Sequence, residues 1–189
     1  MKAKVKSIKT DFRGLSLPNP ATQGRDFEAI LARLGNPVNP GAGVDYPKYG
    51  LEIKTKGEES SSANSVGSMT YENIKITPYP KSNISKKLQQ QFRIKIRNGI
   101  VVSNKIYDFS APHIQAVIEN TYETARAKII AGDDSNYISG GEFGYFERKK
   151  LSGGRLTNSW AFRIPVKSMG KLEGMSQSTY TKFFTNGTS

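Results

Sequence analysis

Two stretches of the chain place apolar residues with the period of an α-helix. The first covers residues 22–35, where Gly35 suits the position after a helix and Pro37 prevents its continuation. Its apolar face consists of Phe27, Ile30, Leu31 and Leu34. The second covers residues 111–132, with Pro112 in the first turn and Gly132 at the end. Its apolar face consists of Ile114, Val117, Ile118, Ala125 and Ile129.

Other stretches alternate apolar and polar residues and predict strands. Residues 91–109 predict a hairpin, because Asn98-Gly99 is typical of a type I′ turn. One face of this hairpin is apolar and the other basic. We also expect a strand over residues 71–77 and a short helix over residues 82–90. A second β unit is expected from strand-like segments over residues 141–151 and 158–169.

The remaining stretches are connectors and ends. Residues 1–20 predict an N-terminal arm or short strand, and residues 174–189 a polar tail. Residues 57–69 are rich in Gly, Ser and Glu and are expected to form a mobile loop. With 189 residues, the chain is expected to form a single domain of the α/β (α+β) class over residues 1–189.

The segment from Val44 to Lys56 has the sequence VDYPKYGLEIKTK and carries the clearest candidate chemistry. Pro47 and Gly50 favour a turn, which would bring Asp45 beside Glu52 at the top of a hairpin. In the following strand Glu52 and Lys54 share one face, and Leu51 and Ile53 the other. Two carboxylates and an ammonium group would then meet at one point. This is a minimal set for binding Mg²⁺ and activating water beside a phosphodiester.

The charge balance favours a polyanionic partner. Lys and Arg number 28 against 16 acidic residues, which gives a formal net charge of +12. A merely soluble basic protein is the alternative. Cysteine is absent and His113 is the one histidine, which argues against thiol and histidine-based mechanisms. No apolar run has membrane-spanning length and no signal peptide is visible, so we expect an intracellular, cytoplasmic protein.

The last third concentrates positive charge around aromatic residues, which suits a ribbon that contacts a DNA groove. The alternative is an ordinary amphipathic hairpin, and in either case we expect Phe146 or Trp160 in the core. The basic residues are Arg148, Lys149, Lys150, Arg155, Arg163 and Lys167.

The spacing Asp45, Glu52, Ile53, Lys54 matches the signature of the PD-(D/E)xK nucleases. The segment DYPKYGLEIKTK resembles the corresponding part of MutH-type mismatch-repair endonucleases and related type II restriction endonucleases. The upstream GRDFE is similar to the motif that carries a further acidic residue in that family, here Glu28. The similarity continues more loosely to Leu172. Val44 stands where the family has proline before the aspartate.

The resemblance implies a restriction-endonuclease-like core, in which helices flank a mixed central sheet and a cleft binds double-stranded DNA. It implies a Mg²⁺-dependent endonuclease in which Mn²⁺ substitutes. Asp45, Glu52 and the main-chain carbonyl of Ile53 would hold the metal. Glu28 would bind it directly or through water, or would hold a second ion. Lys54 would position or deprotonate the attacking water. Lys87 matches the catalytic lysine that lies near the scissile phosphate in the family, with Lys86 as the fallback. Arg148 and Lys149 match the basic pair that enters the DNA groove.

Two other functions fit parts of the sequence. A structure-selective nuclease of the junction-resolvase type could use the same core. A non-catalytic DNA- or RNA-binding protein would have an incidental acidic cluster, but such a protein gains nothing from two carboxylates facing phosphates. The sequence leaves open the recognised bases, nicking against double-strand cutting, and whether a monomer or a homodimer acts.

Overall fold

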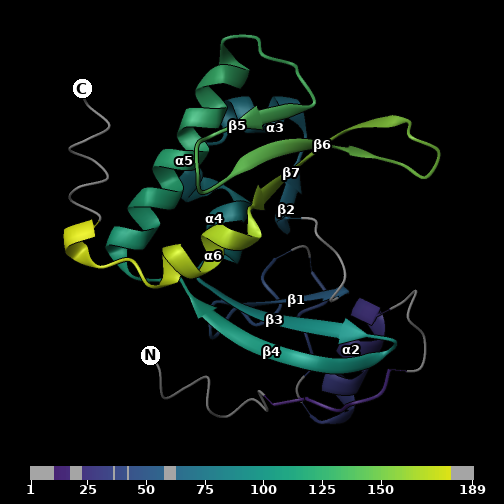
Figure 1. Ribbon diagram of the computed structural model, residues 1–189. Coiled ribbons are helices and arrows are strands. Elements are labelled where there is room, and N and C mark those ends of the chain that lie inside the picture. Colours follow the sequence, from purple (N-terminus) through teal and green to yellow (C-terminus); the bar gives the residue numbers. More distant parts are fainter. Residues whose placement is uncertain (1–10, 18–22, 36, 42, 58–62, 180–189) are drawn as a thin grey trace. The chain divides into compact units, whose positions relative to one another are not determined.

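The computed structural model describes residues 11–17, 23–35, 37–41, 43–57 and 63–179. It is a mixed α+β fold with one β-sheet in each of two compact units (Figure 1). The first unit comprises Met1–Ser61 and Gln89–Asp108, and the second Ser62–Leu88 and Phe109–Ser189. No helix within the described ranges is long and apolar enough to cross a membrane.

The first unit contains a mixed three-stranded sheet in the order β1-β3-β4, with β1 parallel and β4 antiparallel to β3. The hairpin predicted over residues 91–109 is confirmed, and its turn places Asn98 and Gly99 at φ 49° and 77°. The elements are α2 (Gln23–Arg33), β1 (Leu51–Gly57), β3 (Gln90–Arg97) and β4 (Ile100–Asp108).

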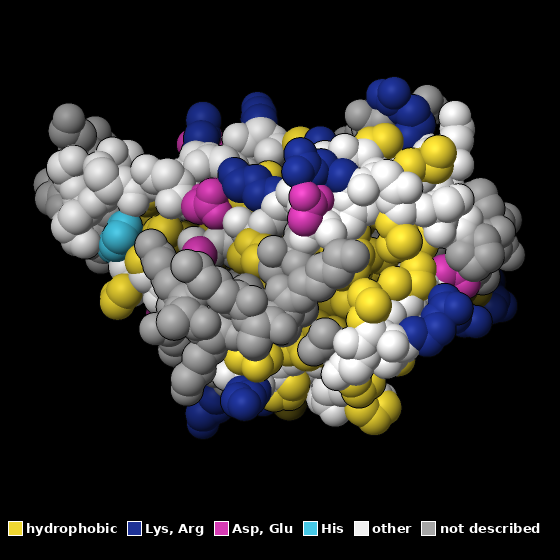
Figure 2. All heavy atoms as spheres, turned by 90° about the horizontal axis from the view of Figure 1, so that it is seen from below, with side chains coloured by type: hydrophobic (Ala, Val, Ile, Leu, Met, Phe, Trp, Pro, Cys, Tyr) yellow, Lys and Arg dark blue, Asp and Glu magenta, His cyan; other side chains and the backbone are white. Residues whose placement is uncertain are grey.

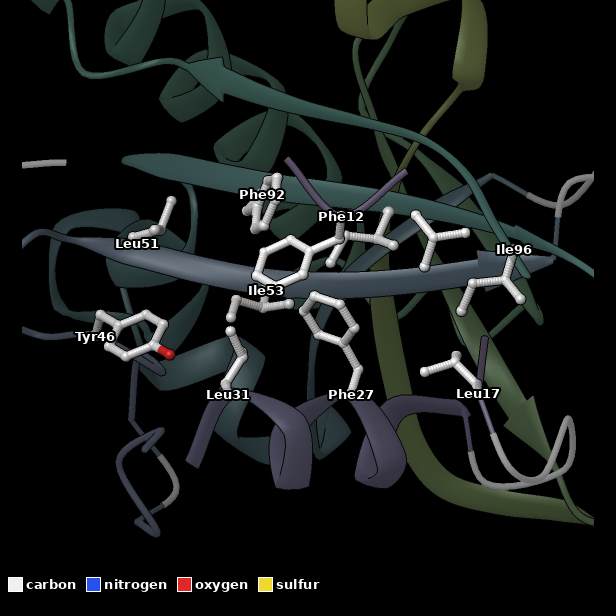
Figure 3. Packing of buried hydrophobic residues seen from close by; sticks show 11 residues of the cluster. Phe12, Leu17, Phe27, Leu31, Tyr46, Leu51, Ile53, Phe92 and Ile96 are labelled. Atoms are coloured by element: carbon white, nitrogen blue, oxygen red, sulfur yellow. The ribbon is translucent and has the colours of Figure 1, made fainter. Parts of the chain in front are cut away.

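One face of this sheet is covered by α2 and by the segment around Phe12 (Figure 3). Phe12 packs edge-on against Phe27, with ring centroids 4.9 Å apart, and Phe27 is fully buried as its helical spacing predicts. Leu34, predicted on the same apolar face, is instead 48% exposed, because α2 ends at Arg33 and Leu34 lies in the turn that follows the helix. The sheet contributes Leu51, Ile53, Phe92, Ile94 and Ile96 to this core.

The second unit is built on an antiparallel sheet in the order β2-β7-β6-β5. Its helices are α3 (Tyr71–Ile76), the 3₁₀ turn η2 (Tyr79–Lys81), α4 (Asn83–Lys87), α5 (Pro112–Ile130) and α6 (Val166–Glu173). Its strands are β2 (Asn64–Met69), β5 (Tyr137–Ser139), β6 (Tyr145–Lys150) and β7 (Leu156–Ile164).

The core of the second unit is aromatic. Tyr122 of α5 packs against Phe146 and Phe162, with ring centroids 5.4 Å and 6.0 Å away. Phe146 and Trp160 are both buried, as predicted. The predicted long helix is confirmed as α5, and all five residues of its predicted apolar face are buried.

Three predictions in the second unit are wrong. Residues 166–169, expected in the last strand-like segment, begin helix α6, because β7 ends at Ile164 and Pro165 has no N–H to continue the strand pairing. Residues 64–69, expected within a mobile loop, form β2, because pairing with β7 supplies the order that their Gly/Ser composition does not suggest. Residues 71–77, expected as a strand, form the helix α3. The Thr70 side chain accepts a hydrogen bond from the Asn73 N–H at its start, and Ile76 is 76% exposed rather than paired with Ile74.

The chain ends are described in part. Phe12 and Leu17 of the predicted arm are buried in the first unit, and Ser16 forms a β-bridge with Ile100. The remainder of the arm lies outside the described residues. The same holds for the tail beyond residue 179 and for residues 58–62 of the predicted loop.

Candidate active site

The turn between Asp45 and Glu52 forms as its sequence predicts. Tyr46 and Leu51 exchange main-chain hydrogen bonds of 2.9 Å and 3.3 Å, and the Gly50 N–H donates to the Pro47 carbonyl. Gly50 adopts φ 61°, a conformation that side chains disfavour. The turn reverses the chain and sets Asp45 against the start of β1.

The carboxylates of Asp45 and Glu52 are held beside one another by main-chain groups. Asp45 Oδ2 accepts a hydrogen bond of 2.7 Å from the Ile53 N–H. Glu52 Oε2 lies 3.3 Å from the Asp45 N–H, which donates to it. Each acidic side chain is therefore bonded to the main chain at or next to the other, which fixes the spacing of the pair.

Lys54 completes the group. Its Nζ donates to Glu52 Oε1 at 2.6 Å, because both side chains leave the same face of β1. Glu52 is 1% exposed and the Lys54 side chain 28% exposed. The opposite face of β1 lies in the core through Leu51 and Ile53, so the predicted apolar support is confirmed.

Asp45 also lines a surface hollow of about 330 Å³ in the first unit. Tyr46, Lys48 and Tyr49 of the turn form part of its wall. Burial, with the Asp45 charge as a second cause, raises the pKa of Tyr46 to about 12. The phenol therefore stays neutral beside the carboxylates at physiological pH.

The sheet register brings more charge to the face that holds Glu52. Glu52 is level with Gln91 of β3, and Lys54 is level with Arg93. On β4, Tyr107 is level with Gln91, and Lys105 is level with Arg93. Residues at the same register on neighbouring strands point to one face, so three cations from three strands form a row beside the glutamate. The sequence predicted a basic hairpin face but not its register with β1.

Arg93 lies close to the carboxylate group and is half-buried. Its Nε and Nη2 donate to Gln91 Oε1 at 3.0 Å and 2.6 Å. Burial lowers the pKa of the Arg93 guanidinium to about 10, while the neighbouring Tyr107 and Glu52 act in the opposite direction. The guanidinium therefore stays protonated at neutral pH. The charges of Tyr107 and Glu52 offset only part of the pKa lowering that burial causes.

Glu28 lies on the exposed side of α2 and forms no ion pair or hydrogen bond with a described residue. Across the described ranges, no three His, Cys, Asp or Glu side chains gather closely enough to hold a metal ion. Glu28 as a further metal ligand stays a prediction.

The predicted lysines of the short helix belong to the second unit. Lys86 and Lys87 form the last turn of α4, where Lys86 is exposed and Lys87 half-buried. The predicted helix itself is confirmed. An approach of Lys87 to the carboxylates stays a prediction.

The basic residues of the last third divide into two arginines held by neighbouring groups and an exposed set. Arg163 forms an ion pair with Glu147, with 2.6 Å between Nε and Oε2. Arg148 lies over the Trp160 ring, 4.8 Å from its centroid, and its Nε donates to the Thr157 carbonyl at 2.7 Å. Lys149, Lys150 and Arg155 are exposed around the β6–β7 turn. Lys and Arg side chains also form larger groups than Asp and Glu on the face drawn in Figure 2.

Sequence reasoning missed Gln91, Arg93 and Lys105 as neighbours of the site. The alternation Phe92–Arg93–Ile94 indicates their face, but the parallel pairing of β1 with β3 decides which of them lie level with Glu52. Such a pairing joins segments far apart in the sequence and has no local signal.

Comparison with protein-family models matches none of them to this chain, and no curated protein matches it at a significant level.

Proposed function

We propose that the protein is a Mg²⁺-dependent DNA endonuclease with a restriction-endonuclease-like core, whose catalytic group is Asp45, Glu52 and Lys54. The observation that carries the proposal is the burial of Glu52. Among the described residues it is the one charged residue that is almost completely buried. Burying a carboxylate costs free energy, and the ion pair with Lys54 offsets that cost only in part. A functional site explains why the remaining cost is tolerated.

The residues present suit Mg²⁺. The ion prefers hard oxygen ligands, and it commonly takes one or two protein carboxylates and completes its shell with water and substrate phosphates. Asp45 and Glu52 offer two carboxylates fixed side by side by the Ile53 and Asp45 N–H groups. The Ile53 carbonyl is the implied third oxygen. Mn²⁺ is expected to substitute.

Bound there, the ion would supply Lewis-acid stabilisation of charge on the phosphate. The protein supplies the remaining functions. Lys54 is held at Glu52 Oε1, where its ammonium group can orient a water molecule and donate to negative charge that develops in the transition state. Glu52 thus fixes both the metal site and the lysine.

The row of Lys54, Arg93 and Lys105 supports binding of a polyanion to this face. Each phosphate that a cation neutralises releases a counterion, which is the main source of non-specific affinity for DNA. Arg93 adds a charge that does not titrate near neutral pH, since its pKa is about 10. The net charge of +12 acts in the same direction.

The β6–β7 ribbon supports duplex DNA as the substrate. Lys149, Lys150 and Arg155 are exposed on it, and a two-stranded ribbon fits the major groove. Arg148 is held against Trp160 and shapes the base of the ribbon. We assign the groove contacts chiefly to the three exposed cations.

Incubation of supercoiled plasmid with the protein tests the proposal. We expect relaxed or linear product with Mg²⁺ or Mn²⁺ and none with EDTA. Intact plasmid across several methylated and unmethylated DNAs would rule out the nuclease. Cleavage of branched junctions without cleavage of linear duplex would reassign the protein as a structure-selective nuclease.

A further inference from the structure

The outer parts of β6 and β7 extend beyond their sheet as a two-stranded ribbon (Figure 1). Strand β2 pairs with β7 only between Trp160 and Ile164, and β5 pairs with β6 only between Tyr145 and Glu147. Within the part of the chain that the structure describes, residues 149–159 therefore pair only with one another. At about 3.3 Å per residue, the ribbon projects roughly 13 Å, which exceeds the depth of the major groove of DNA, about 8.5 Å.

The tip of the ribbon has a fixed shape. Gly153 and Gly154 take φ 92° and 82°, which glycine adopts without strain. The Leu151 N–H donates to the Arg155 carbonyl, and the Gly154 N–H donates to the Leu151 carbonyl, both at 2.9 Å. A tip closed by its own hydrogen bonds loses little entropy when it enters a groove.

The charge of the ribbon complements DNA on every side. The side chains of Lys149, Lys150 and Arg155 form no ion pair or hydrogen bond within the described ranges. No acidic residue occurs in the sequence between Arg148 and Ile164. Cations without acidic neighbours remain available for phosphates and base edges.

Two leucines stand among these cations. Leu151 is 45% and Leu156 is 37% exposed. Leu156 is level with Lys150, and Leu151 bonds across the turn to Arg155, so the two leucines lie on opposite faces of the ribbon. Each face thus presents one leucine beside one cation. A single exposed leucine is ordinary, but one on each face suits a ribbon with DNA on both sides.

We propose that Leu151 and Leu156 contact the C5-methyl groups of thymine in the major groove of duplex DNA. The cations on the same faces have phosphates and acceptor atoms of the bases as partners. For a leucine in this groove, the apolar partner on the base edges is the C5-methyl group. The inference rests on the proposed function and adds to it the chemical group that the ribbon recognises.

Affinity for DNA with and without this methyl group tests the inference. The probes are copies of one plasmid fragment amplified with dTTP or with dUTP, and binding is followed by fluorescence anisotropy in Ca²⁺. The wild type is expected to bind the thymine duplex about fourfold more tightly for each methyl group contacted, the effect of one buried methylene. The double variant Leu151→Ala/Leu156→Ala is expected to bind both duplexes equally.

Two variants serve as controls. Leu34→Ala removes a leucine that is 48% exposed just beyond α2, and it is expected to keep the preference for thymine. Lys150→Ala is expected to weaken binding to both duplexes by the same factor.

Equal wild-type affinities for the two duplexes would overturn the inference, as would a preference that the leucine double variant retains. Failure of the proposed function would appear separately, as intact supercoiled plasmid in Mg²⁺. Equal affinities together with normal cleavage would therefore remove the methyl contact and leave the nuclease standing.

Discussion

The two units use burial in opposite ways. The first unit is built on a small sheet and buries Glu52, with Gln91 level with it and the guanidinium of Arg93 close by. The second unit buries aromatic rings around Tyr122 and keeps its cations at the surface of the β6–β7 ribbon. A polar interior lowers stability and an aromatic one raises it. Under the proposed function, the first unit would carry the catalytic group and the second would supply the DNA contacts.

The largest expected effect follows from removal of the lysine in the first unit. Lys54→Ala should lower plasmid cleavage by about 10³-fold or more, because both charge stabilisation and water positioning depend on this ammonium group. Binding of DNA in Ca²⁺ should change little. Lys81→Ala removes the same charge from an exposed position in the second unit and should leave cleavage within about twofold. Equal losses of cleavage in the two variants would contradict a catalytic role for Lys54.

The second unit should be strongly destabilised by a side chain at Gly140. A Cβ there would lie 2.0 Å from the Thr121 carbonyl oxygen of α5, so the helix backbone would have to move. Gly140→Ala should lower the free energy of unfolding by about 3 kcal/mol. Gly170→Ala in α6 has open space and should raise it by up to about 1 kcal/mol. Denaturant unfolding followed by the fluorescence of Trp160 measures both, and a tolerated Gly140→Ala would contradict the close packing.

Cations of the β6–β7 ribbon should determine the affinity for DNA rather than the rate of cleavage. The triple variant Lys149→Ala/Lys150→Ala/Arg155→Ala should reduce the slope of log affinity against log salt by about 0.9 for each phosphate that the protein no longer neutralises. Cleavage at saturating DNA should stay within a few-fold of the wild type. A matched variant replaces three exposed lysines of the same unit outside the ribbon, namely Lys81, Lys128 and Lys171, and should keep the wild-type slope. An unchanged slope in the ribbon variant would remove the ribbon from the interface.

The smallest expected effect concerns pH. Burial, with the Glu123 charge as a second cause, raises the pKa of Tyr122 to about 12, so the folded state holds the proton that the unfolded state loses near pH 10. The free energy of unfolding should therefore fall as pH rises from about 10 to 12. Tyr122→Phe should weaken this pH dependence. It should also lower stability by about 1 kcal/mol at neutral pH, since the Tyr122 hydroxyl donates to the Thr77 carbonyl. An unchanged alkaline slope would contradict the assignment.

Local signals predicted the parts of the molecule that depend on neighbouring residues. The turn at Gly50, the Asn98-Gly99 hairpin and α5 all follow from spacing and turn chemistry. The strand β2 has no such signal, because its order comes from pairing with β7 almost a hundred residues away. Helix α3 had a signal in the Thr70 cap, which the alternation of Ile74 and Ile76 obscured.

The candidate site shows the same division. The sequence predicted Asp45, Glu52 and Lys54 because seven to nine residues and one turn connect them. It could not predict the row with Arg93 and Lys105, since only strand register brings these residues level with Lys54. The local arrangement of these three side chains was therefore predictable from the sequence, and the charges around them were not.

Mn²⁺ binding measured by electron paramagnetic resonance tests the central claim most directly. Asp45→Asn keeps an oxygen that can accept from the Ile53 N–H, so the turn should survive while one charged ligand is removed. If Asp45 and Glu52 hold the metal, the wild type binds Mn²⁺ and the variant binds it at least about tenfold more weakly, with a parallel loss of cleavage. Equal Mn²⁺ affinity in the two proteins would contradict the account.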